Sequence, residues 1–196
     1  MENQKPSRLI YPIIRSILHP LLHPLLHPLL FLLPILLSSL LLLTISSCVS
    51  EEPQPDPLAV GDSCPRFSIL TDAGLTLSMP DSDGRYSVII FFNTECPDCR
   101  KELPVIQNVY DEINRQDIPA TLIAISRNQS EEEVASYWRH NNLSIPFSAQ
   151  TDTKIYNLFA TSIIPRIYIA NPDGIITHIW TDNPLPTSAQ ILAALR

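Results

Sequence analysis

The sequence predicts an α/β sandwich in which a mixed central β-sheet has helices on both faces and is preceded by an N-terminal β-hairpin. The first observation is the apolar, β-branched and aromatic run at residues 88–92, which fits a buried strand and leads into a helical pattern. The second is the alternating strand at 120–126, followed by another helical pattern. The third is a strand–turn–strand unit at 166–180 before a final helix at 188–196. Strand–helix repeats predict parallel strands, and a closing hairpin adds antiparallel ones, so the sheet is mixed.

Two hairpins are predicted from turn residues between short strands. Residues 66–70 and 75–79 flank Asp72-Ala73-Gly74, and residues 166–170 and 175–180 flank Asn171-Pro172-Asp173-Gly174. Asp83-Gly84 marks a further turn that leads into the strand at 88–92.

Helix boundaries are also marked in the sequence. Ile118-Pro119 ends the helix that follows the first buried strand. Ser130-Glu131-Glu132-Glu133 is a capping box that opens a helix to about residue 141, which explains the three glutamates without a metal. Residues 152–160 are predicted to form one more short helix.

The first 47 residues have the pattern of a targeting segment. Lys5, Arg8 and Arg15 precede an apolar stretch that contains three copies of His-Pro-Leu-Leu, a low-complexity repeat in which the prolines prevent a regular helix. The stretch ends in Ile45-Ser46-Ser47-Cys48, which resembles a bacterial lipobox and implies a lipid on Cys48 after cleavage. An uncleaved signal anchor is the alternative. Both place the rest of the chain outside the cytoplasm, where disulfide chemistry is permitted.

The predicted organisation is a lipoprotein signal peptide at 1–47, a tether at 48–59 and one domain at 60–196. Nine of the 19 prolines lie in the first 57 residues, whereas all four glycines lie beyond them. The eleven residues 49–59, rich in proline and acids, would extend over roughly 30 Å as polyproline II. Residues 48–196 carry 19 acidic and 10 basic side chains, which argues against a nucleic-acid partner.

Cys96-Pro97-Asp98-Cys99 lies where the buried strand gives way to a helix. Exposed N–H groups and the dipole of a helix N-terminus favour a thiolate, and Pro97 suits the first helical turn. Zinc is disfavoured because the chain has no second pair of ligands at the right spacing. Two inert buried cysteines would leave the Pro-Asp insert and the junction position unexplained.

The segment Thr94-Glu95-Cys96-Pro97-Asp98-Cys99-Arg100-Lys101-Glu102-Leu103-Pro104 resembles the active-site segment of the thioredoxin superfamily, and its tail resembles the membrane-tethered TlpA/ResA branch. The resemblance runs from about residue 60 to the C-terminus and implies a thioredoxin-like fold. Two residues depart from the pattern: Glu95 replaces the usual tryptophan, and Ile90 replaces the buried aspartate of thioredoxins proper.

The residues suggest distinct roles for the two cysteines. Cys96 meets solvent first and is the expected nucleophile, and Cys99 is the resolving thiol. Glu102 falls one turn beyond Cys99 at the edge of an apolar stripe, where desolvation would raise its pKa and suit it to carry protons. The resemblance adds that this branch has a functional glutamate at the matching position; an edge carboxylate that simply reaches solvent is the alternative.

The resemblance further implies that Ile164-Pro165 is the family's cis-proline loop, packed against the cysteines and free to pair with an extended substrate. Arg166 follows where a small residue is common. Asp98 between the thiols and Glu95 before them would disfavour a thiolate, so we expect a reductant whose potential is tuned by Pro97 and Asp98. Cys64 is predicted to be a small buried side chain.

The predicted activity is reduction of protein or cytochrome disulfides by a tethered, monomeric enzyme that needs no cofactor beyond a redox-active Cys96–Cys99 disulfide. Its partners would be those substrates, a membrane or periplasmic electron donor and the membrane itself. A peroxiredoxin-like peroxidase is one alternative, although Asn93 stands where such enzymes carry threonine and no proline precedes it. A copper-delivery protein of the same fold is another, but it would normally have three residues between its cysteines and a distal histidine.

Overall fold

The computed structural model describes residues 56–196, and the predicted signal peptide, Cys48 and most of the predicted tether lie outside this range. The described residues contain a two-stranded sheet, β1 (Phe67–Leu70) with β2 (Thr76–Met79), and a five-stranded sheet. The five-stranded sheet has the order β5-β4-β3-β6-β7. Its members are β3 (Tyr86–Phe92), β4 (Ala120–Ser126), β5 (Phe147–Ser148), β6 (Arg166–Ala170) and β7 (Ile176–Trp180).

The central sheet is mixed, as predicted. β3, β4 and β5 run parallel, whereas β6 is antiparallel to β3 and β7 is antiparallel to β6. Almost every residue of β3, β4 and β6 is buried, because both faces of a sheet with parallel crossovers are covered. The alternation expected for residues 120–126 is therefore replaced by burial on both sides.

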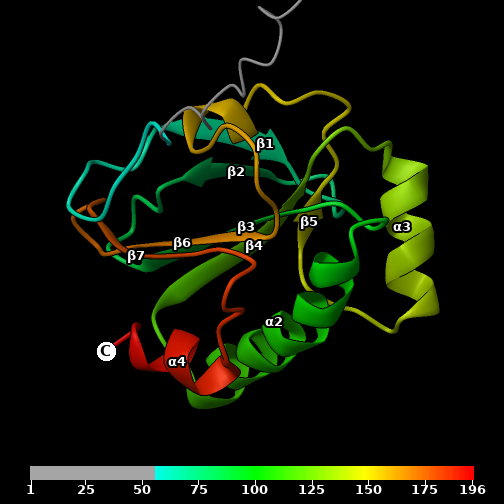
Figure 1. The fold of residues 1–196 in the computed structure, drawn as a ribbon. Helices are drawn as coiled ribbons and strands as arrows, with labels where there is room; N and C mark the ends of the chain where they lie inside the picture. The colour runs from blue at the N-terminus through cyan, green and yellow to red at the C-terminus, as the bar shows by residue number, and fades with distance from the viewer. Residues whose placement is uncertain (1–55) are drawn as a thin grey trace, which may run out of the picture. The chain divides into compact units, whose positions relative to one another are not determined.

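Three α-helices cover one face of this sheet. They are α2 (Pro97–Gln116), α3 (Glu131–His140) and α4 (Ser188–Ala193), and Figure 1 shows α2 and α4 below the sheet. Their buried side chains share one core cluster with alternate residues of the central strands, among them Ile90, Phe92, Leu103 and Trp138. The crossovers β3–α2–β4 and β4–α3–β5 proceed in the same direction across the sheet, and their common right-handedness accounts for helices on the same face.

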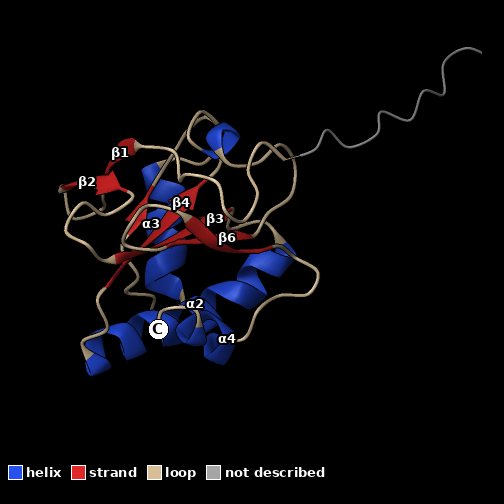
Figure 2. Cartoon of the chain, turned by 90° about the vertical axis from the view of Figure 1, so that its left-hand side faces the viewer, coloured by secondary structure: helices blue, strands red, loops and turns tan. Residues whose placement is uncertain are grey.

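The other face carries the β1–β2 hairpin and a single 3₁₀ turn, Tyr156–Leu158 (Figures 1 and 2). The predicted short helix at residues 152–160 is thus wrong apart from this turn. Asp152 Oδ1 accepts a hydrogen bond from the Lys154 backbone N–H, a local bond that competes with helix formation. Helices are expected on both faces, and within residues 56–196 they are unequally divided: three α-helices lie on one face and one 3₁₀ turn lies on the other.

Local signals for turns and caps are confirmed. Both predicted hairpins form, and Gly174 has φ +75° in the turn between β6 and β7, a conformation that glycine adopts without strain. The Ser130 side chain accepts from the Glu133 N–H while Glu133 accepts from the Ser130 N–H, so the predicted capping box is present. Asp56 and Leu58, at the end of the predicted tether, contact the folded domain.

Candidate active site

The two cysteines lie at the junction between β3 and α2, at the edge of the sheet where the parallel strands end. Cys96 is the N-cap of α2, Pro97 follows in the first turn, and the Cys96 Sγ accepts a hydrogen bond from the Cys99 N–H at 3.4 Å. The helix N-terminus therefore presents a backbone donor to this sulfur, in the arrangement that stabilises a thiolate. Both cysteines are free thiols in the structure.

Their environments differ. Cys96 is half-buried, whereas Cys99 is fully buried beneath the helix. Burial, followed by the hydrogen bond with Cys96, raises the pKa of the Cys99 thiol well above its usual range. A disulfide approaching from solvent would therefore meet Cys96 first, and Cys99 would need an acceptor for its proton before it could react.

Glu102 lies on the same buried face of α2 as Cys99. Its residue is only 1% exposed, and among the described residues its Oε1 has no hydrogen-bond partner. Burial raises the pKa of this carboxyl group to about 7. From the sequence, Glu102 is expected at the edge of the apolar stripe of this helix. In the structure Glu102 is instead fully buried, on the same side of α2 as Cys99, Leu103 and Ile106.

The loop before β6 lies against Cys96, although it is 68 residues away in the chain. The Cys96 Sγ lies 3.6 Å from the Ile164 carbonyl oxygen, to which the thiol donates, and the Ile164–Pro165 peptide bond is cis. Arg166, the next residue, is buried and forms an ion pair with Asp56. Cys96, Cys99, Ile164 and Pro165 thus occupy one site, with Glu102 further along α2.

Asp98 lies on the exposed side of the first helical turn. Its carboxylate is 2.7 Å from the Lys101 Nζ, and its side chain is 41% exposed. The negative charge between the two thiols is therefore partly compensated by a neighbouring cation.

A buried glutamine, which the sequence analysis did not identify, holds the segment before Cys96. Gln129 Oε1 accepts from the Thr94 N–H at 2.8 Å, and Gln129 Nε2 donates to the Thr94 Oγ1 at 2.6 Å. Arg100 Nε donates to the Thr94 carbonyl oxygen. All three polar groups of Thr94 are thus paired, two residues before Cys96. No sequence signal identifies Gln129, because its partner is 35 residues away.

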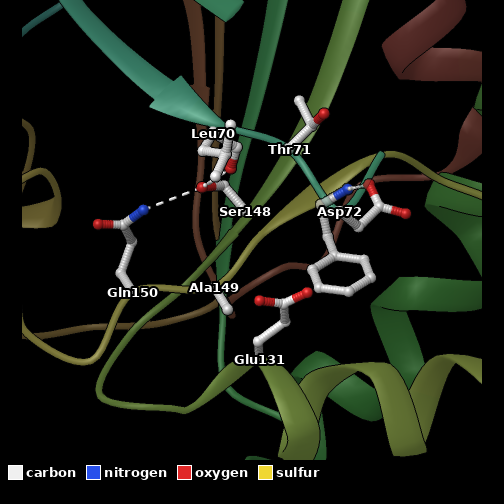
Figure 3. Close-up of a pocket in the computed structure, with 8 residues that line it drawn as sticks. Leu70, Thr71, Asp72, Glu131, Ser148, Ala149 and Gln150 are labelled. Atoms are coloured by element: carbon white, nitrogen blue, oxygen red, sulfur yellow. Dashed lines mark hydrogen bonds between the residues drawn. The ribbon is translucent and has the colours of Figure 1, made fainter. Parts of the chain in front are cut away.

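A small pocket lies elsewhere, between the end of β1, β5 and the start of α3 (Figure 3). Figure 3 shows Gln150 donating to Ser148, a bond of 2.9 Å from Nε2 to Oγ. Its lining residues are Leu70, Thr71, Asp72, Glu131, Phe147, Ser148, Ala149 and Gln150. None of these is a predicted site residue.

Residues 60–179 match the model of the AhpC/TSA family, which is more than half of the chain. The chain belongs to the AhpC/TSA family. Two relatives from Bacillus subtilis (strain 168) are the thiol-disulfide oxidoreductase ResA and the sporulation thiol-disulfide oxidoreductase A. The first is 22% identical over 126 residues, covering 64% of this chain and 69% of the relative. The second is 26% identical over 126 residues, covering 64% and 72% respectively.

Solved structures confirm the thioredoxin-like fold. A putative protein disulfide isomerase from Bacteroides thetaiotaomicron aligns with a TM-score of 0.65 and 20% identity, covering 74% of this chain and 94% of that one. A peroxidoxin, BcpB from Mycobacterium tuberculosis, aligns with a TM-score of 0.58 and 13% identity, covering 71% and 97%. The predicted resemblance to ResA-type proteins is confirmed. Among the described residues 56–196, no helix combines the length and apolar composition needed to cross a membrane.

Proposed function

We propose that this protein is a thiol-disulfide oxidoreductase that reduces disulfides of proteins or cytochromes through Cys96 and Cys99. The observation that carries the proposal is the pairing of a half-buried N-cap sulfur with a fully buried second thiol three residues later. Such a pair separates the attacking and resolving roles. The relatives named as thiol-disulfide oxidoreductases support the same class.

The reaction begins when the Cys96 thiolate attacks one sulfur of the substrate disulfide. A Cys96–substrate disulfide forms, and the other substrate sulfur leaves as a thiolate. Cys99 then loses its proton and attacks the Cys96 Sγ, so that a Cys96–Cys99 disulfide forms and the second substrate thiolate leaves. Two electrons pass to the substrate, whose thiolates take up two protons. A dithiol donor returns the enzyme to its reduced form and leaves as a disulfide.

Glu102 is the proposed proton acceptor for Cys99. A carboxyl group with a pKa of about 7 exists in both protonation states near neutral pH, which suits a group that both accepts and returns a proton. Its unpartnered Oε1 is open to such an exchange, directly or through water. The Ile164 carbonyl oxygen, close to the nucleophile, is positioned to pair with the backbone of an extended substrate segment.

The proposed location is the bacterial cell envelope, with the domain facing the periplasm or the outside. The lipobox-like sequence before Cys48 supports a lipid anchor, and the proline-rich segment after it supports a tether. Substrate disulfides and the electron donor would then be encountered close to the membrane.

A thiol peroxidase is the second candidate, because the family and the peroxidoxin likeness include that class. The geometry at Asn93 disfavours it. Asn93 Nδ2 donates to the Arg127 carbonyl oxygen and Asn93 Oδ1 accepts from the Glu95 N–H, so this side chain stabilises the loop. Peroxide-dependent oxidation of the dithiol at a rate above that of disulfide reduction would favour the peroxidase.

Trapping of mixed disulfides tests the proposed roles. We expect Cys99→Ser to accumulate disulfide-linked substrate through Cys96, because attack still occurs and resolution does not. We expect Cys96→Ser to accumulate none, since the remaining thiol is buried and protonated. Non-reducing gels and mass spectrometry detect the adducts. Equal trapping by the two variants would contradict the assignment.

A further inference from the structure

Arg166, the first residue of β6, carries a buried positive charge beside the active site. Its side chain is 5% exposed, and its Nη1 lies 2.6 Å from the Asp56 Oδ2. A buried guanidinium needs a counter-charge, because its removal from water is costly and an unpaired buried charge is strongly destabilising. Asp56 supplies that charge from outside the 60–179 segment that matches the family.

The same carboxylate also contacts the start of the loop that leads to β6. Asp56 Oδ1 accepts from the Thr161 N–H at 3.3 Å and lies 3.5 Å from the Thr161 Oγ1. One oxygen therefore contacts the first residue of the 161–165 loop, and the other contacts Arg166, which directly follows the loop. Asp56 joins the two ends of a segment that is 105 residues away in the chain.

The carbonyl groups inside the loop are held as well. Arg127 Nη1 donates to the Ser162 oxygen at 3.0 Å. The Ile163 oxygen accepts from the Tyr156 Oη at 2.8 Å and from the Arg166 Nε at 3.2 Å. Arg166 thus connects Asp56 to Ile163, because its guanidinium pairs with Asp56 and donates to the Ile163 oxygen. The next residue is Ile164, whose carbonyl oxygen contacts the Cys96 Sγ.

We propose that Asp56 is a positioning residue for the disulfide substrate: through its ion pair with Arg166 and its bond to Thr161 it fixes the 161–164 backbone at the nucleophile. The proposal rests on the proposed oxidoreductase function. In this proposal Asp56 acts through Thr161 and Arg166. It sets the geometry of the Ile163 and Ile164 backbone along which a protein substrate docks, and small displacements of such groups weaken binding strongly.

The test compares a protein disulfide with a small one. The protein substrate is insulin, whose disulfides the enzyme reduces with dithiothreitol as the electron donor. The small disulfide is 5,5′-dithiobis(2-nitrobenzoate), which needs no docking against the backbone of the enzyme. We expect Asp56→Asn to raise KM for insulin about tenfold with kcat changed less than about twofold. The rate with the small disulfide stays at the wild-type value. Asp56→Glu restores KM, and Asp62→Asn, at a nearby exposed acid that does not contact the loop, leaves it unchanged.

A double variant separates positioning from general destabilisation. Arg166→Met removes the buried charge, so Asp56→Asn in that background leaves no unpaired cation and is expected to cause no further rise in KM. Near-UV circular dichroism checks that each variant is folded. An unchanged KM in folded Asp56→Asn, independent effects of the two substitutions, or an equal loss with the small disulfide overturns the proposal. Cys96→Ser tests the proposed function separately: if this variant still catalyses insulin reduction, the proposed function is overturned. The two tests are distinguishable because the Asp56 variants leave Cys96 and Cys99 unchanged.

Discussion

At the scale of single residues, the active site combines two groups whose pKa values are raised by burial. Cys99 and Glu102 both lie on the buried face of α2, and desolvation disfavours the charged form of each. A buried thiol that must lose a proton and a buried carboxyl that titrates near neutrality are complementary. This pairing also has a measurable effect on stability.

Glu102→Gln is expected to change how stability depends on pH. The folded-state pKa of about 7 lies above the unfolded value, so between about pH 4.5 and 7 the unfolded state releases the proton first. Stability therefore falls as pH rises through this window, by up to about 3 kcal/mol at 1.36 kcal/mol per unit of pKa. The variant should match wild type at pH 4 and exceed its free energy of unfolding at pH 8.

Urea unfolding of the reduced protein at both pH values measures this difference. Glu112→Gln, at a partly exposed position on the same helix, is the matched control. It should show no comparable gain at pH 8, because the pKa of Glu112 is lowered by its hydrogen bond with Arg115. A Glu102→Gln profile parallel to that of wild type would contradict the burial argument.

Asp98→His is expected to raise the reduction potential. A negative charge about 7 Å from a thiolate costs roughly 2 kcal/mol at an effective dielectric of 20, and exposure of Asp98 and its ion pair with Lys101 reduce this to about 1 kcal/mol. Since about 1.4 kcal/mol corresponds to 30 mV, the expected rise is some tens of millivolts. Equilibration with glutathione buffers measures it, and Lys101→Met, which removes the compensating cation, should shift the potential in the opposite direction.

At the scale of elements, the start of α2 is held by a neighbouring loop. Gln129, between β4 and α3, occupies the N–H and the hydroxyl of Thr94, and its residue is only 4% exposed. Because these two groups of Thr94 are buried, replacing Gln129 by a side chain that cannot form hydrogen bonds would leave both of them without a partner. The loop thereby fixes where the helix, and with it Cys96, begins.

Gln129→Met should destabilise the protein by about 2–3 kcal/mol, since the side chains have similar volume and the loss is one of hydrogen bonding. Chemical denaturation measures the change. Thr94→Val in the Gln129→Met background should cost less than it does in wild type, because the hydroxyl has already lost its partner. Gln116→Met, at the exposed end of α2, should stay within about 0.5 kcal/mol.

At the scale of the whole molecule, the N-terminal segment and the domain are two units, divided between Glu52 and Pro53. The lipid predicted on Cys48 belongs to the first unit. The structure describes the second unit from Asp56 onward, a residue that is eight positions after Cys48 and pairs with Arg166.

Cys48→Ala should abolish incorporation of radiolabelled palmitate, because the modified sulfur is lost. Cys64→Ala is the matched control and should retain the label, since Cys64 is buried and burial raises its pKa to about 11. Label that persists in Cys48→Ala would exclude the lipoprotein assignment.

The sequence by itself determined the features that depend on neighbouring residues. The Ser130 capping box, the two hairpin turns and the start of a helix at Cys96-Pro97 are each encoded within a few positions, so local propensity was sufficient to predict them. The two-residue strand β5 was missed, because it exists only by pairing with Ala124 and Ile125 of β4.

Only the tertiary structure decided the surroundings of the reactive sulfur. The contact of Cys96 with Ile164 spans 68 residues, that of Thr94 with Gln129 spans 35, and that of Asp56 with Thr161 spans 105. The depth at which Glu102 is buried likewise depends on how α2 packs within the folded domain. Hydrogen bonding and desolvation depend on which groups lie close together in space, and for residues far apart in the sequence this is determined by the packing of the folded domain.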